Sequence, residues 1–324
     1  MAKKRIRTLG TLAYVANQTV TLDLPREYVM SKLMLELTGS MVITSAATDI
    51  NESPQSLLRR VDVVKDGLSP INWDGGSLAA YNYFMTGVVP AITALPGTVV
   101  ATGALRAFLN LPFESQRTGE PWRTLLPSNR ANTLQLKVTW GSGTNLVSGG
   151  VTSGLAATLN VLSEELMNRP EAIAPEGRFD EMIVSKVVRL FAAATSTAQV
   201  PLPKQFPCRG LLIRAATTGN DGRDLSDTVI NTLKLTERLT LDSFVMTWDQ
   251  LRQQNELDYS LAEDLNSPTS PFRSKGYAFL DFVKLGLNDM IDPRSFSEFD
   301  LFLDVDATTH VTVWPICIAP ARQG

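Results

Sequence analysis

Two stretches of the sequence lie 178 residues apart and follow one pattern: residues 22–28 read LDLPREY, and residues 200–206 read VPLPKQF. In each stretch an apolar segment ends in Leu-Pro, a basic residue, a Glu or Gln, and an aromatic residue. We interpret the two stretches as parts of an internal repeat, because the shared proline, charge and aromatic positions go beyond the periodicity common to any two strands. The next apolar residues also align without a gap: Leu33, Leu35 and Leu37 match Leu211, Ile213 and Ala215.

Three further blocks recur in the same order, and their offsets shrink gradually as loop-length differences would make them do. Each block alternates apolar and polar residues, which is typical of half-buried antiparallel strands. The matched blocks are 57–63 with 229–235, 107–111 with 278–282, and Leu134, Leu136 and Val138 with Leu301, Leu303 and Val305. The sequence therefore predicts a duplicated all-β protein in which short strands and many turns build each copy.

Helical patterns are few, and the two clearest lie at corresponding places in the two copies. We predict helices over 77–85 and 247–257, opening near the capping residues Ser77 and Thr247. Each falls between the second and third matched blocks, which supports the duplication. Each copy is thus predicted to be an eight-stranded jelly roll with a short flanking helix, and the whole chain a double jelly roll.

The predicted seam between the copies is residues 168–177, which read NRPEAIAPEG. Its prolines, glutamates and glycine favour an extended, semi-rigid linker. We therefore predict jelly roll 1 over residues 18–167 and jelly roll 2 over residues 178–324. Residues 1–17 are predicted to form a basic N-terminal arm and a first strand.

Composition excludes several classes of function. The 324 residues are 44% hydrophobic and 19% charged, which indicates a globular chain, and the net charge of −3 argues against a dedicated nucleic-acid binder. The single histidine, His310, rules out multi-histidine metal centres, and any Ser-His or Cys-His catalysis would depend on it alone. Cys208 and Cys317 lie 109 residues apart and cannot form a disulfide framework, so we interpret them as small buried hydrophobes in a reducing compartment.

The longest uncharged stretch, residues 75–105, is long enough to cross a bilayer, but prolines and glycines interrupt it. We interpret it as a helix followed by a loop and a strand, and we find no targeting segment. We expect a soluble, non-secreted chain. The absence of charge from this stretch also predicts that it supplies contacts between subunits.

Possible chemical sites have simpler interpretations as surface structure. The glycine-rich segment from Gly141 lacks the lysine of a phosphate-binding loop, and the cluster of Asp221, Asp224 and Asp227 lacks the spacing of a calcium loop. Glu164 and Glu165 are adjacent, so in a strand they point to opposite faces and cannot flank one bond. We predict no catalytic, cofactor-binding or metal-binding residues.

One charge cluster has a plausible partner: the basic residues Lys3, Lys4, Arg5 and Arg7. They form either a solubilising tail or a surface attracted to anionic lipid headgroups or to a genome. In both interpretations residues 1–7 stand outside the core, so their removal is expected to leave the fold stable.

With its tandem jelly rolls, flanking helices, linker and basic arm, the chain resembles the double jelly-roll major capsid proteins of tailless icosahedral bacteriophages, the adenovirus-like lineage. The resemblance is one of architecture and size, carried by the blocks at Leu22–Leu37 and Val200–Ala215 and by Phe108 with Phe279. It implies homotrimers that imitate hexagons and tile a virion shell assembled in the host cytoplasm. The implied partners are other copies, other virion proteins and, at the arm, internal membrane lipids, with no cofactor and no sequence-specific nucleic acid.

Other classes remain open from the sequence alone. A double jelly roll can be a carbohydrate-active enzyme or lectin, for which Trp73, Trp122 and Trp248 are the candidate sugar platform. A bicupin metalloenzyme would need histidine ligands that the chain lacks. A minor vertex or spike protein of a virion would differ from a major shell protein in its abundance in particles.

Overall fold

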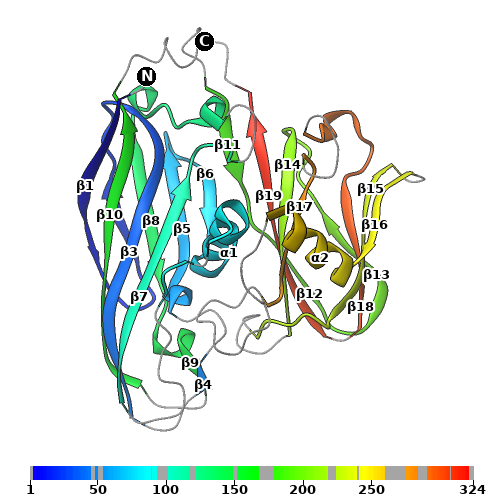
Figure 1. Ribbon diagram of the computed structural model, residues 1–324, viewed down its shortest axis with the longest axis horizontal. Coiled ribbons are helices and arrows are strands. Elements are labelled where there is room, and N and C mark those ends of the chain that lie inside the picture. Colours follow the sequence, from blue (N-terminus) through cyan, green and yellow to red (C-terminus); the bar gives the residue numbers. More distant parts are fainter. Residues whose placement is uncertain are drawn as a thin grey trace. The chain divides into compact units, whose positions relative to one another are not determined.

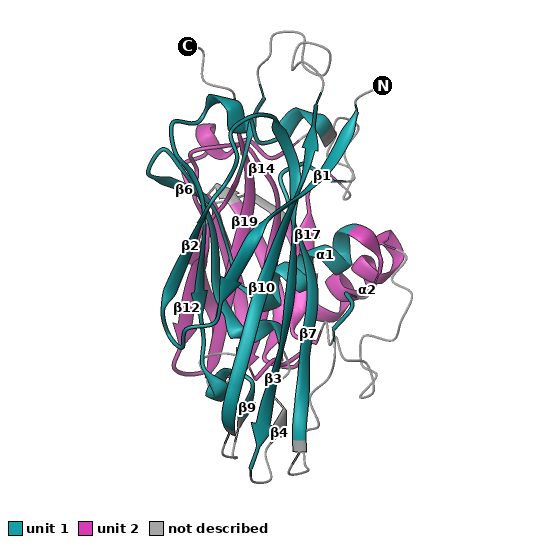
Figure 2. Cartoon of the chain, turned by 90° about the vertical axis from the view of Figure 1, so that its left-hand side faces the viewer, with its two compact units in different colours: residues 1–85, 89–182, 320–324 teal, residues 86–88, 183–319 magenta. Residues whose placement is uncertain are grey.

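The structure is a computed structural model, and it describes residues 3–44, 48–49, 54–88, 90–92, 101–116, 121–148, 152–167, 179–217, 224–238, 241–259, 275–283, 290–306 and 308–320. These residues form two compact units (Figure 2). Unit 1 contains residues 1–85, 89–182 and 320–324, and unit 2 contains residues 86–88 and 183–319.

Unit 1 is a jelly roll of antiparallel strands in two sheets (Figure 1). In the first sheet the strand order is β1 (Lys4–Ala13), β10 (Thr152–Leu166), β3 (Val29–Ile43) and β7 (Ala101–Pro112). In the second the order is β2 (Thr19–Asp23), β8 (Leu134–Trp140), β5 (Leu58–Lys65) and β6 (Leu68–Trp73). A short ribbon pairs β4 (Thr48–Asp49) with β9 (Val147–Ser148).

Unit 2 repeats this strand order. Its first sheet runs β12 (Val187–Phe191), β19 (Thr309–Ala319), β14 (Cys208–Thr217) and β17 (Tyr277–Asp281). Its second runs β13 (Thr195–Pro201), β18 (Asp300–Val305), β15 (Ile230–Arg238) and β16 (Leu241–Thr247). The predicted duplication is confirmed, because the matched sequence blocks fall on equivalent strands of the two units, or, for residues 22–28 and 200–206, at the ends of the equivalent strands β2 and β13.

Each unit also carries one helix, as predicted, and the two helices lie between equivalent strands: α1 between β6 and β7, and α2 between β16 and β17. Helix α1 spans Gly75–Thr86 and helix α2 spans Trp248–Tyr259. Thr247 caps α2 by accepting the Gln250 N–H at 3.1 Å, and Gln250 accepts the Thr247 N–H at 2.9 Å. The cap of α1 is Asp74, whose carboxylate accepts the Ser77 N–H at 2.9 Å. Ser77, the predicted N-cap, is therefore the third residue after the N-cap, Asp74, and forms the other half of the capping box.

The strand registers show that the block beginning at Leu134 was aligned two residues away from its true counterpart in the second copy. Leu22 lies opposite Leu136, and its counterpart Val200 lies opposite Leu301. Leu136 therefore corresponds to Leu301, whereas the sequence match assigned it to Leu303. The pairs β5–β8 and β15–β18 give the same correspondence. A slip of two residues keeps every side chain on its own face, so the apolar pattern alone could not reveal it.

The match of Phe108 with Phe279 fails for the same reason. Leu35 lies opposite Leu109, and its counterpart Ile213 lies opposite Ala278, so Leu109 corresponds to Ala278. Phe279 then corresponds to Asn110 and not to Phe108. Burial agrees, because Phe108 is 37% exposed and Phe279 is fully buried. The strands are equivalent, but the shared Ala-Phe-Leu sequence is a coincidence.

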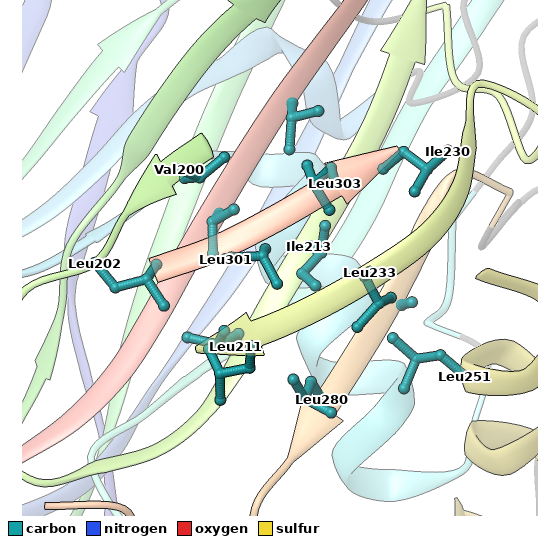
Figure 3. Close-up of a cluster of buried hydrophobic side chains, with 14 of the residues drawn as sticks. Val200, Leu202, Leu211, Ile213, Ile230, Leu233, Leu251, Leu280, Leu301 and Leu303 are labelled. Atoms are coloured by element: carbon teal, nitrogen blue, oxygen red, sulfur yellow. The ribbon is translucent and has the colours of Figure 1, made fainter. Parts of the chain in front are cut away.

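Each unit buries the apolar face of its strands. In unit 2 the core combines both sheets with α2, and Figure 3 shows Leu251 of the helix beside Leu233 and Leu280. Burying a leucine of this kind stabilises a fold by about 1.5–3 kcal/mol relative to an exposed side chain. Leu136 and Val138 of β8 are equally buried in unit 1, where buried and half-buried positions alternate along the strand.

The uncharged stretch at 75–105 has a different role from the one predicted. Every residue of α1 from Gly75 to Met85 is buried within the chain itself, and Gly75 lies directly against the backbone of Gln55. These residues are therefore core, and the prediction that they supply contacts between subunits is wrong for them. Within the described part of the chain, no helix has the length and apolarity needed to cross a membrane.

The predicted linker, residues 168–177, lies outside the described residues. The residues that follow the linker pack on unit 1, because Phe179 belongs to a small buried cluster with Val29, Leu125 and Leu166. The division between the units falls within β11 (Glu181–Val184), between Met182 and Ile183.

Candidate functional site

The predicted basic cluster is part of the sheet. Residues 4–7 begin β1 and pair with β10 in continuous register, Lys4 opposite Leu166 and Arg7 opposite Ser163. The backbone carbonyl of Lys3 accepts the N–H of Met167 at 2.9 Å. The expectation that residues 1–7 stand outside the fold is therefore wrong for Lys3 to Arg7. The sequence contained one signal, the alternation of Arg5 and Arg7 with Ile6, which fits an edge strand.

Acidic partners explain why basic residues enter this strand. Lys4 Nζ lies 2.8 Å from a carboxylate oxygen of Glu164, and Arg7 lies 3.2 Å from Glu27. The guanidinium of Arg5 lies 5.9 Å from the ring centroid of Tyr28, within the range of a cation–π contact. Lys4 and Arg7 thus compensate carboxylates within unit 1, and the residues Lys4 to Arg7 lie on the edge strand of its first sheet.

Glu164 is the centre of this cluster. Its carboxylate accepts Ser31 Oγ at 2.8 Å, and Lys32 Nζ lies 3.4 Å from its second oxygen. Burial by itself would raise the pKa of Glu164, but the hydrogen bonds from Lys4 and Ser31 and the charge of Lys32 lower it below its usual value. The same hydrogen bond raises the pKa of Lys4. Both groups are therefore charged at neutral pH, and the pair fastens the start of β1 to β10.

A side-chain amide closes the opposite edge of that sheet. Asn82 of α1 donates through Nδ2 to the carbonyl of Asn110 at 2.7 Å, and its Oδ1 accepts the N–H of Asn110 at 2.6 Å. Both free backbone groups of one residue on the edge strand β7 are thus satisfied by one amide. The helix covers an edge that would otherwise present unpaired donors and acceptors.

Unit 2 has the same clamp. Asn255 of α2 donates to the carbonyl of Phe279 at 2.7 Å and accepts its N–H at 2.8 Å, on the edge strand β17. Asn82 and Asn255 are each the eighth residue of their helix, and Asn110 and Phe279 are the residues that the registers make equivalent. The sequence comparison did not identify the two asparagines, because it did not align the residues that they bind, Asn110 and Phe279, which only the strand registers make equivalent.

The other edge of each first sheet is open. Among the described residues, no strand pairs with the outer edge of β1 or of β12. These edges carry large apolar side chains: Ile6 is 62% exposed on β1, and Leu190 is 62% exposed on β12 beside the exposed Val188. An uncovered strand edge with apolar side chains is a surface suited to contacts with another chain.

The candidate chemical residues do not assemble into a reaction centre. His310 lies within β19, opposite Leu190 on β12 and Ala216 on β14. Asp227 forms an ion pair with Arg252 at 3.0 Å and accepts the Gly276 N–H at 2.6 Å, while Asp221 lies outside the described residues. In the part of the chain that the structure describes, no three His, Cys, Asp or Glu side chains are grouped to hold a metal ion.

The candidate sugar platform is also dispersed. Trp73 and Trp248 are buried in the cores of their units, at 0% and 1% exposure, and only Trp122 reaches solvent. Trp73 stacks on Tyr81 of α1 at a centroid distance of 5.1 Å. A sugar needs an exposed aromatic face, so these tryptophans do not form the predicted platform.

The duplicated strand order, one helix per unit and a clamped edge define the chain as a double jelly-roll protein, the fold of major capsid proteins of icosahedral viruses. Among solved structures it is similar to the STIV MCP, with a TM-score of 0.74 and 17% identity over 98% of this chain and 97% of that one. The major capsid protein of Bacteriophage PM2 gives a TM-score of 0.60 at 10% identity, with 99% of both chains covered. The Faustovirus major capsid protein also gives 0.60, at 9% identity over 99% of this chain and 90% of that one.

No family model and no curated protein sequence matches the chain. The likeness therefore lies in the fold, and it extends over nearly the whole length of the proteins compared.

Proposed function

We propose that the protein is the major shell subunit of an icosahedral virion. The observation that carries this proposal is the duplication: two jelly rolls with one strand order, each with one clamped and one open edge. Its support from other proteins is the fold that the chain shares with major capsid proteins along their length.

We further propose that the subunit forms homotrimers. Three copies place six similar jelly rolls around one axis, so that a threefold object can occupy a sixfold position in a lattice. The open edge of β12, with the exposed Leu190 and Val188, is the surface we assign to contacts between copies or with other virion proteins, in place of the buried residues 75–85.

Light scattering after size exclusion tests the trimer. Three chains of 35.4 kDa give a particle of about 106 kDa, held by an interface of more than about 2,000 Å² if the trimer is obligate. A Leu190→Asp variant should dissociate more readily than an Arg189→Glu variant on the same strand, if β12 is part of that interface. A stable 35.4 kDa monomer at micromolar concentration would contradict the proposed function.

We also propose that the outer side of β1 faces anionic lipid headgroups inside the particle. Glu164 and Glu27 compensate Lys4 and Arg7, so we assign the lipid contact mainly to Arg5, whose guanidinium lies over the ring of Tyr28 and not beside a carboxylate. Each basic residue near a charged surface contributes about 1 kcal/mol, and many copies in a shell act together.

Vesicle sedimentation tests this assignment. Assembled protein should bind vesicles that contain phosphatidylserine, and the Arg5→Glu variant should lose at least about tenfold in affinity. Arg189→Glu, at an exposed position of β12, is the matched single charge reversal and should bind like the wild type. Equal binding of all three proteins, or binding to neutral vesicles only, would contradict a lipid-facing role.

A further inference from the structure

The two cysteines, distant in sequence, are neighbours in unit 2. Cys208 begins β14, Cys317 lies in β19, and the antiparallel register places them directly opposite each other. Cys208 is fully buried and Cys317 is 3% exposed, both as free thiols within the unit 2 core. The sequence interpretation as buried hydrophobes is thus incomplete, because the spacing of 109 residues concealed a facing pair.

The backbone hydrogen bonds identify the kind of pair. The N–H of Cys208 donates to the carbonyl of Ile291 at 2.7 Å, and the Cys208 carbonyl accepts the Ile291 N–H at 3.0 Å. Both backbone groups of Cys208 therefore point away from Cys317, which makes this a non-hydrogen-bonded pair. Such pairs bring their Cα atoms to about 4.5 Å and their side chains closest together. A disulfide accepts Cα separations of about 4.4–6.8 Å, so the pair falls within its range.

Adjacent contacts hold the strands at this point. Ile318 donates its N–H to the carbonyl of Pro207 at 2.8 Å, next to the cysteine pair. Burial and the hydrogen bond with Cys317 raise the pKa of the Cys208 thiol. Since the thiolate is the reactive species, this thiol is protected from adventitious modification at neutral pH and reacts slowly.

We propose that Cys208 and Cys317 form a reversible cross-strand disulfide when the protein meets an oxidising thiol–disulfide pool. Cys208 or Cys317 attacks a low-molecular-weight disulfide such as oxidised glutathione and releases one glutathione thiol. The second cysteine then displaces the other, so that the protein loses two hydrogens and two molecules of reduced glutathione form. The bond closes a loop that contains β14 to β19 and ties the last strand of the unit to its core.

The expected consequence is greater stability without a change of register. Closing a loop of this length restricts the unfolded chain strongly, and Tm should rise on the order of 10 °C. The inference depends on the strand register of unit 2 and not on the proposed shell function.

The test incubates the full chain in glutathione buffers that range from fully reduced to fully oxidised. Parallel samples start from reduced and from oxidised protein, and incubation continues until both reach the same fraction of disulfide. Intact mass should fall by two hydrogens in oxidising buffer. Non-reducing tryptic digestion should link the peptide of residues 205–209 to that of residues 295–322, since these are the peptides that contain the cysteines. The linked protein should melt at the higher temperature, and dithiothreitol should reverse both changes.

The single variants Cys208→Ala and Cys317→Ala serve as controls that retain one thiol. Neither should show an oxidant-dependent Tm, although both lose some stability from the smaller side chain. Three outcomes overturn the proposal: both thiols remain free in oxidising buffer whichever starting protein is used, the disulfide joins two chains, or a stable glutathione adduct is the end product. A linked protein whose Tm is unchanged or lower would also overturn it, because the native register would then not accommodate the bond.

Discussion

Replacing Asn255 with alanine should lower the free energy of unfolding of unit 2 by about 2–4 kcal/mol. The substitution removes both hydrogen bonds to Phe279, a residue with no exposure, so its N–H and carbonyl lose their partners without gaining water. Denaturant unfolding followed by tryptophan fluorescence measures the loss. Hydrogen exchange should also show faster exchange at β17, since the edge strand loses its cover.

Two further variants make this result specific. Gln253→Ala, at an exposed position of the same helix, should change stability by less than about 0.5 kcal/mol. Asn82→Ala should destabilise unit 1 by about 1–2 kcal/mol, less than its counterpart, because Asn110 is only half-buried and water can replace part of the amide. An Asn255→Ala protein with wild-type stability and exchange would show that the clamp contributes nothing.

Deleting residues 1–7 should lower the free energy of unfolding by about 2–3 kcal/mol. The deletion removes the first four residues of β1, with their ladder to β10, and leaves the buried Glu164 without Lys4. Differential scanning calorimetry should show unit 1 melting several degrees earlier. Lys4→Gln separates the two causes, because it keeps the strand and loses only the ion pair; its effect should be the smaller one. A truncated protein that melts like the full chain would indicate that these residues form a free tail.

Much of the architecture could be predicted from the sequence. Alternation along the leucines of β3 and β8, together with the Leu-Pro blocks at residues 22–28 and 200–206, was enough to identify two β domains and their order. The capping residue Thr247 located the start of α2 to within one residue. These signals are local, so each survives without knowledge of the partner strands.

What could not be predicted depends on pairing across long distances. The two-residue slip between Leu301 and Leu303 preserves the apolar face, so only the ladder to β13 reveals it. The contact of Cys208 with Cys317 follows from the β14–β19 register, which spacing in the sequence does not determine. The start of β1 resembled a tail because its acidic partner, Glu164, lies 160 residues away. In α1, absence of charge could mean an interface or a core, and packing against Gln55 decides for the core.

The equivalent positions of Asn82 and Asn255 also indicate how the two units are related in evolution. The two copies differ at most positions, yet each helix keeps Asn at its eighth residue, bound to the equivalent residue of the equivalent strand. The simplest history is that the helix and its amide existed in a single-domain ancestor before its gene was doubled. Such an ancestor would have had one sheet edge covered by the helix and its amide, and one edge uncovered. Gene doubling then placed two such domains in one chain, and the two halves diverged while each kept its amide on the covered edge.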